Sequence, residues 1–103
     1  MKRVKRRYLA LQLEMDYIPS EKEFMDTVWG SVTRLYGEVG ASLTGMALID
    51  FNVSYKIAVL RTSLETLDHV RASLACITCV AGKNVSVNVL AVSGTIKALF
   101  KKI

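Results

Sequence analysis

The sequence lacks most of the side-chain sets on which protein catalysis and metal binding depend. Its 103 residues include one histidine and two cysteines. No Ser/His/Asp set and no pair of carboxylates stands at a spacing suited to catalysis. A structural zinc site needs four ligands, whereas here a lone Cys76-x-x-Cys79 pair stands with His69. We therefore expect no catalytic residues, no metal and no cofactor bound by this chain.

The two cysteines lie in a segment with helical spacing of apolar residues. A redox pair becomes reactive when it opens a helix, whereas Cys76 and Cys79 fall near the end of the predicted helix. We predict that both are buried core residues with a packing role only. His69 is predicted to be a surface or interface side chain.

Long apolar runs are also missing. The apolar stretch after the basic start, residues 8–13, contains Gln12 and stops at Glu14, so it is too short for a signal peptide. The longest charge-free run of the second half, residues 84–96, is too short to cross a bilayer. With closely spaced cysteines, these absences predict one cytoplasmic domain over residues 1–103, with no membrane contact.

Acidic residues are absent from both ends of the chain. All nine lie between Glu14 and Asp68. Residues 1–13 carry five basic residues and residues 69–103 carry another five, so the net charge of +5 is concentrated at the ends. If the ends meet in the fold, they form one basic surface suited to a polyanion such as nucleic acid. The alternative is a pair of ends that are merely solvated.

The first half begins with a strand and a helix. Residues 7–15 alternate with a period of two, which is typical of a strand with one buried face. Ser20 and Glu23 form a capping box that begins a helix, and Gly37 is predicted to end it. Residues 37–45 are then predicted to form a loop.

A hairpin and a second helix follow. Residues 46–51 and 55–62 are apolar on both faces and are predicted to pair as a hairpin. Thr62 and Glu65 are predicted to form a second capping box, and the helix that it begins is predicted to end near Gly82.

The chain closes with a strand and a short helix. Residues 85–89 alternate as a strand, and Ser93 is predicted to cap a helix with apolar residues at Ile96, Leu99, Phe100 and Ile103. The resulting order predicts an α+β fold, a ferredoxin-like or RNA-recognition-like βαββαβ sandwich with an extra C-terminal helix. Many unrelated functions use this topology, so the fold alone does not choose among them.

Two local features bear on how an RNA would be bound. RNA-recognition domains stack bases on aromatic residues of the central strands, and here only Tyr8 and Tyr55 are candidates, which favours phosphate and shape contacts. Ser93-Gly94-Thr95, followed by Lys97, combines free amides, hydroxyls and positive charge at a helix start, which suits a phosphate. An ordinary capped helix uses the same residue types.

Several segments resemble the ribonuclease P protein component 2 family of archaea and eukaryotes. In chain order they are Arg7-Tyr8-Leu9, Tyr36-Gly-Glu-Val-Gly-Ala-Ser42, Ala58-Val-Leu-Arg61, Val70-Arg-Ala-Ser-Leu74 with Ile77-Thr78, and Val92-Ser-Gly-Thr-Ile-Lys97. Thr62 stands where the family is expected to have cysteine, and some members continue beyond the position of Ile103.

The resemblance implies a subunit of the endoribonuclease that removes the 5′ leader from precursor tRNA. It implies that RNA carries the chemistry through bound Mg²⁺. The implied partners are the catalytic RNA, a protein subunit of TIM-barrel-like fold and, indirectly, precursor tRNA, with room for self-association in the complex. By analogy, the following residues are assigned to RNA binding: Arg3, Lys5, Arg6, Arg7, Ser93, Gly94, Thr95, Lys97, Lys101 and Lys102.

Two other functions fit the same residues. One is a ferredoxin-like module that binds a small ligand or regulates another protein, with basic ends that are only solvated. The other is a scaffold that binds protein alone and docks through its final helix. RNA that co-purifies with the chain would separate the ribonucleoprotein function from both.

Overall fold

The computed structural model describes residues 5–15, 19–80 and 82–102, and a four-stranded antiparallel sheet forms its centre. The strands are β1 (Arg6–Glu14), β2 (Ala47–Asn52), β3 (Ile57–Ser63) and β6 (Ser86–Ser93). Their order across the sheet is β2-β3-β1-β6, so the first and last strands are neighbours. With one helix after β1 and another after β3, this is the predicted ferredoxin-like arrangement.

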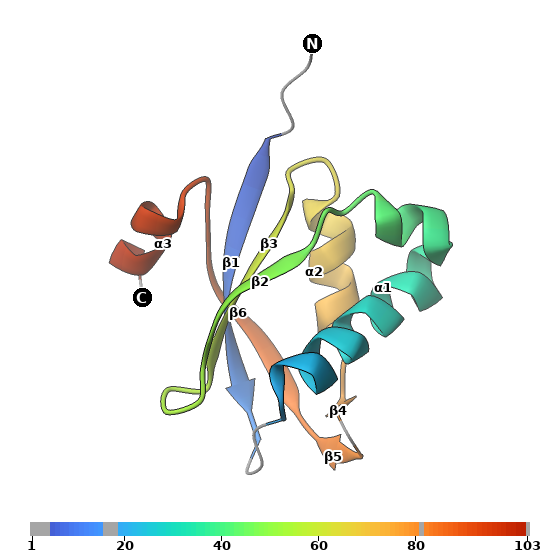
Figure 1. Cartoon of the computed structure of the whole chain (residues 1–103), viewed down its shortest axis with the longest axis horizontal. Helices are drawn as coiled ribbons and strands as arrows, with labels where there is room; N and C mark the ends of the chain where they lie inside the picture. Colours follow the sequence, from blue (N-terminus) through green and yellow to red (C-terminus); the bar gives the residue numbers. More distant parts are fainter. Residues whose placement is uncertain (1–4, 16–18, 81, 103) are drawn as a thin grey trace.

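Helices α1 (Glu21–Ser42) and α2 (Leu67–Ala75) cover one face of the sheet (Figure 1). Alternate residues of β1, namely Leu9, Leu11 and Leu13, point into this main core. Phe24 and Val28 of α1 meet them there and are fully buried. The period of two in β1 and the helical spacing in α1 therefore bury the same core from its two sides.

Helix α3 (Ile96–Lys102) lies on the other face (Figure 1). Leu99 is fully buried there against Ala10 of β1 and Val59 of β3, and Tyr8 packs beside them. The sequence predicted one buried face for β1, but both faces are buried, because α3 forms a second, smaller core on the opposite face. None of the described helices is long and apolar enough to span a membrane.

Helix α1 begins as predicted and ends later than predicted. The Ser20 side chain accepts from the backbone N–H of Glu23, and the Glu23 carboxylate accepts from the N–H of Ser20, which completes the capping box. Gly37 has φ +76, so it interrupts the helix as a glycine can. Residues 38–42 nevertheless resume helical structure, so the prediction of a loop from Gly37 was wrong over this segment.

Helix α2 begins without the predicted capping box. Thr62 remains in β3, and its hydroxyl donates to the Thr44 carbonyl at 3.1 Å. The residue before the helix is Thr66, whose hydroxyl lies 2.6 Å from that of Ser63 and makes no cap bond. The predicted capping box at Thr62 and Glu65 was wrong because β3 extends three residues beyond its apolar run, to Ser63.

The end of α2 also differs from the prediction. The helix stops at Ala75, and a small hairpin of β4 (Cys79–Val80) and β5 (Lys83–Asn84) follows. Gly82 has φ +78 and belongs to this hairpin, not to a helix terminus. Cys76 and Cys79 therefore leave the apolar face of α2 and are both exposed, so the prediction of buried cysteines was wrong.

Helix α3 is capped by a different residue from the one predicted. The Thr95 hydroxyl accepts from the N–H of Ala98 at 3.1 Å, which is the typical bond of an N-cap. Ser93 belongs to the end of β6, and its Oγ lies 3.5 Å from the Thr95 nitrogen. Leu99 confirms the buried side of the predicted stripe, whereas Phe100 is 47% exposed and Ile103 lies outside the described residues.

Candidate nucleic-acid interface

The pairing of β1 with β6 brings the two basic ends of the chain together. The strands are antiparallel, and Tyr8 near the start of β1 stands opposite Ser93 at the end of β6. The start of β1, which carries Arg6 and Arg7 and directly follows Lys5, therefore lies beside the turn that leads into α3 (Figure 1). Arg3 lies outside the described residues. The sequence could not show whether the two basic ends meet. The fold shows that they do.

The Arg7 side chain lies against Gly94. A Cβ added at Gly94 would lie 3.4 Å from Nη1 of Arg7, so the guanidinium rests against this glycine. Nη1 also donates to the Arg6 carbonyl at 2.9 Å, which holds the side chain along its own strand. The turn between β6 and α3 thus carries a fixed positive charge on its surface.

Helix α3 adds three lysines to the same region. Lys102 folds back so that its Nζ donates to the Val92 carbonyl in β6 at 2.9 Å. Lys97 and Lys101 are exposed on the helix. None of these lysines, and none of Lys5 to Arg7, pairs with a carboxylate among the described residues. An ion pair forms instead on α1, between Lys22 and Asp26. Their charge is consequently available to an external anion.

The segment Ser93-Gly94-Thr95 differs in exposure along its length. Ser93 is buried at the strand end, whereas Gly94 and Thr95 are exposed. The Thr95 hydroxyl accepts one bond from Ala98, which leaves its O–H free to donate to a ligand. Gly94 and Thr95 therefore lie on the basic surface, with Ser93 beneath them.

Arg61 is a basic residue near this surface that the charge pattern did not single out. It stands opposite Tyr8 in the β1–β3 pairing, so the two side chains share the face on which α3 lies. In the sequence it belongs to the acidic middle of the chain, which concealed its proximity to the ends. Only the register of β1 with β3 reveals it.

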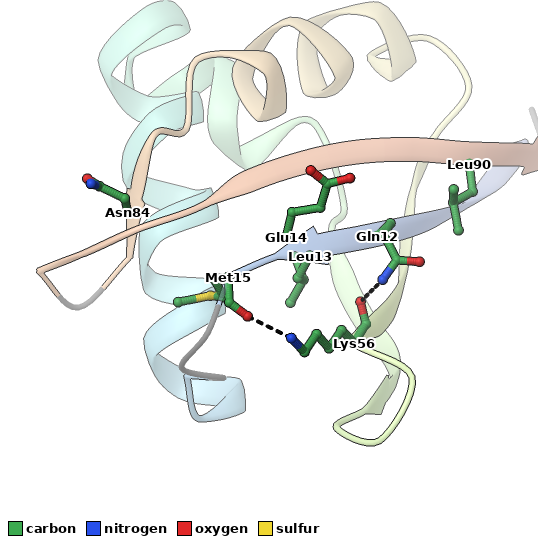
Figure 2. Close-up of a pocket in the computed structure, with 7 residues that line it drawn as sticks. All are labelled: Gln12, Leu13, Glu14, Met15, Lys56, Asn84 and Leu90. Atoms are coloured by element: carbon green, nitrogen blue, oxygen red, sulfur yellow. Dashed lines mark hydrogen bonds between the residues drawn. The ribbon is translucent and has the colours of Figure 1, made fainter.

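The opposite end of the sheet holds an open depression of about 810 Å³ (Figure 2). Gln12 and Lys56 line it, but their polar atoms already fix the β2–β3 hairpin to β1. Nε2 of Gln12 donates to the Lys56 carbonyl at 3.2 Å, and Nζ of Lys56 donates to the Met15 carbonyl at 2.9 Å. Binding sites for small ligands usually present several polar groups that converge on the ligand. This depression gives little support to a small-ligand function.

Metal-ligating side chains are dispersed in the described part of the chain. Residues 5–15, 19–80 and 82–102 contain no group of three or more His, Cys, Asp or Glu side chains placed to hold a metal ion. His69 instead stacks on Tyr36, with ring centroids 4.2 Å apart, between α2 and α1. His69 is exposed, which confirms the predicted surface position.

The sheet order, the added helix and the shared basic surface define a ferredoxin-like α+β protein with one strongly cationic end. Within that class the chain belongs to the Rpp14/Pop5 family, whose model matches residues 7–103. This match takes in Arg7, the end of β6 and α3, and it begins after Lys5 and Arg6.

Individual relatives extend over nearly the whole chain. It is 33% identical over 100 residues to ribonuclease P protein component 2 of Pyrococcus abyssi, covering 97% of this chain and 85% of that protein. It is 34% identical over 102 residues to the protein of the same name from Methanobrevibacter smithii, covering 92% and 85%. The fold also matches a chain in a cryo-EM structure of yeast ribonuclease MRP with TM-score 0.69, at 16% identity over 92% of this chain and 78% of that chain.

Proposed function

We propose that this chain is a protein subunit of ribonuclease P that supports the catalytic RNA in endonucleolytic removal of the 5′ leader from precursor tRNA. Its near full-length similarity to ribonuclease P protein component 2 of two archaea supports the assignment. The observation that carries it is the convergence of the start of β1, the end of β6 and α3 in one basic surface, whose cations pair with no carboxylate of the described residues. The proposed site of action is the cytoplasm.

In this proposal the protein contributes charge and shape, and RNA contributes the chemistry. Mg²⁺ is held by the RNA of the holoenzyme and not by this chain. Lysine and arginine side chains neutralise phosphates and release condensed counterions, which stabilises a compact RNA fold. The proposed contacts to RNA phosphates are Arg3, Lys5, Arg6, Arg7, Lys97, Lys101 and Lys102. Ser93, Gly94 and Thr95 are proposed to form a phosphate-binding site.

The proposed protein partners are a ribonuclease P subunit of TIM-barrel-like fold and, within the complex, a second copy of this chain. Large apolar side chains remain exposed on the second half of α1 and just beyond it, where Leu35, Val39 and Leu43 are 44%, 76% and 65% exposed. Apolar groups that gather on a surface commonly mark protein interfaces. These residues lie on the face of the sheet that α1 and α2 cover, away from the basic surface beside α3 (Figure 1). Protein and RNA contacts therefore need not compete.

The test is to purify the tagged chain from its source and sequence the RNA that accompanies it. The proposal expects one dominant structured RNA together with precursor tRNA. A matched variant, Lys5→Ala with Arg6→Ala and Arg7→Ala, should lose most of that RNA while retaining its fold, because these positions precede the buried part of β1. Recovery of protein partners alone, with no enriched RNA, would contradict the proposal and favour the protein-only scaffold.

A further inference from the structure

Arg61 is a partly buried cation with an unused donor. Its Nε is buried and has no hydrogen-bond partner among the described residues. No described side chain forms an ion pair with its guanidinium. A buried donor left without a partner costs free energy in the folded protein, and the cost is larger for a charged group. The isolated fold therefore offers no compensation for placing arginine at this position.

The strand registers place Arg61 in a row that runs across the sheet. Arg61 of β3 stands opposite Tyr8 of β1, and Tyr8 stands opposite Ser93 of β6. Directly paired residues in antiparallel strands point to the same face, so the three side chains share the face on which α3 packs. Neighbouring strands lie about 4.8 Å apart, which puts the Cα atoms of Arg61 and Ser93 at roughly twice that separation. The row joins Arg61 to the turn that carries Gly94.

We infer that Arg61 is an RNA phosphate ligand that extends the basic surface from the strand ends onto the sheet face beside α3. The inference rests on the proposed function, and it adds a residue from the acidic middle of the sequence to the contacts at the ends. A guanidinium presents its donors in a planar fork that matches two phosphate oxygens. Tyr8 flanks the site from β1 and carries a hydroxyl that can donate to the same ligand.

The charges around Arg61 favour a phosphate over a carboxylate from a protein partner. Lys102 and Arg7 are held at the adjacent strand ends through bonds to the Val92 and Arg6 carbonyls. The acid closest in register is Asp50, which stands opposite Val59, and its carboxylate accepts from the N–H of Phe51. Arg61 is thus the inner member of an unpaired cationic group, and such a group attracts a polyanion more strongly than a single carboxylate.

The test compares Arg61→Met with Arg71→Met in binding to the RNA that co-purifies with the wild-type protein. Both substitutions remove one positive charge, but Arg71 is exposed on α2, across the sheet from this site. Arg61→Met should weaken binding about tenfold and make the slope of log K against log salt shallower by about 1. Arg71→Met should retain the wild-type slope.

The thermal midpoint separates a ligand role from a structural role. Replacing an uncompensated buried ion by an apolar side chain of similar length is often neutral or stabilising, so Arg61→Met should melt at or above the wild-type temperature. Arg61→Lys should keep the wild-type salt slope with lower affinity, because lysine retains the charge and loses the fork. This variant also serves if Arg61→Met fails to fold.

Three results would overturn the inference. They are a wild-type affinity and slope in Arg61→Met, a wild-type affinity in Arg61→Lys, or a lower melting temperature in Arg61→Met with unchanged RNA binding. Each of these variant results is compared with the wild-type protein, which should bind RNA with a steep salt dependence. A flat salt response in the wild type would instead contradict the proposed function itself.

Discussion

Gly94 lies against the Arg7 side chain, where the two basic ends of the chain meet. Its φ is not in the left-handed region, so the backbone at this position can accept a side chain without strain. Gly94→Ala should fold normally, because the added Cβ would make an ordinary contact with the flexible end of Arg7. Gly94→Glu should also fold, but its carboxylate would pair with the Arg7 guanidinium and repel a phosphate.

We predict that holoenzyme reconstituted with Gly94→Glu cleaves precursor tRNA about tenfold more slowly at low Mg²⁺, since the added carboxylate lowers the surface charge by one unit and pairs with the Arg7 guanidinium. Gly94→Ala is the matched control and should cleave at the wild-type rate. Thermal melts of the same preparations establish that both variants are folded. Wild-type cleavage by folded Gly94→Glu would show that this turn has only a structural role.

The cap of α3 gives a prediction at the scale of one hydrogen bond. Because Thr95 accepts from Ala98 at 3.1 Å, Thr95→Ala should lower the free energy of unfolding by about 1 kcal/mol. Ser93→Ala should cost less, since the Ser93 Oγ is 3.5 Å from its donor. Chemical denaturation of the two variants measures the difference. A larger loss in Ser93→Ala would assign the cap to Ser93 instead.

Exposure of both cysteines leads to a prediction about thiol reactivity. A thiol reagent should modify two thiols in the folded protein at a rate close to that in denaturant, because Cys76 and Cys79 are exposed. The Cys76→Ser and Cys79→Ser double variant should change the free energy of unfolding by no more than about 0.5 kcal/mol. Thiols that react only after unfolding would show that the cysteines are buried.

Charge and periodicity predicted the residues of the basic surface at the strand ends, but not the exposure of the cysteines or the position of Arg61. The cysteines were misplaced because Ile77 continues the helical spacing of Leu74, although the chain has already left α2. Arg61 depends on the pairing of two strands distant in sequence, which no local pattern encodes.

At the scale of elements, α1 contains two glycines that differ in the sign of φ, which is positive at Gly37 but not at Gly30. Gly30 lies within the helix, and a Cβ there would meet no atom within 4 Å. Gly37 has φ +76, which strains any other residue. Gly30→Ala should therefore raise the free energy of unfolding by up to about 1 kcal/mol, and Gly37→Ala should lower it by about 1 kcal/mol or more.

Chemical denaturation of the pair checks this prediction, with each variant serving as the control for the other. Equal effects of the same sign would contradict the kinked helix. The kink at Gly37 also sets the direction of the last turn of α1, which carries the exposed apolar residue Val39 and leads to Leu43. Gly37→Ala should consequently weaken any protein contact made by that segment while leaving RNA affinity unchanged.

The order of the main elements was predictable because each carries its own period and its own start or stop signal. Strand β1 and the start of α1 follow directly from alternation and from Ser20 with Glu23. The same capping pattern at Thr62 and Glu65 was misleading. Thr62 pairs with β1 as part of β3, and its hydroxyl donates to the Thr44 carbonyl instead of capping a helix. Gly82 served a hairpin instead of a helix end. Where tertiary pairing competes with a local signal, pairing prevails.

At the scale of the molecule, topology converts a charge pattern along the chain into a charged end in space. A ferredoxin-like sheet places its first and last strands side by side and antiparallel, so the start of the domain meets the end of its last strand. The acidic middle forms α1, the hairpin and the start of α2. The basic residues at the start of β1 and on α3 therefore gather at one end of the fold, whereas Arg71 on α2 and Lys83 on β5 lie apart from them. A cationic end of this kind steers a polyanion toward it.

The most direct test of the central claim is the salt dependence of RNA affinity in two triple variants. The first is Lys5→Ala with Arg6→Ala and Arg7→Ala. The control is Arg34→Ala with Arg71→Ala and Lys83→Ala, which removes the same charge from exposed positions on α1, α2 and β5, away from the basic surface although Arg71 and Lys83 belong to the acid-free part of the sequence. With about four to six phosphate contacts, the wild-type slope of log K against log salt should be roughly −3 to −6. The account predicts that the first variant loses about 2 to 3 units of slope and that the control keeps the wild-type value. A flat wild-type response, or equal losses in the two variants, would contradict the claim that the joined ends of the chain bind RNA.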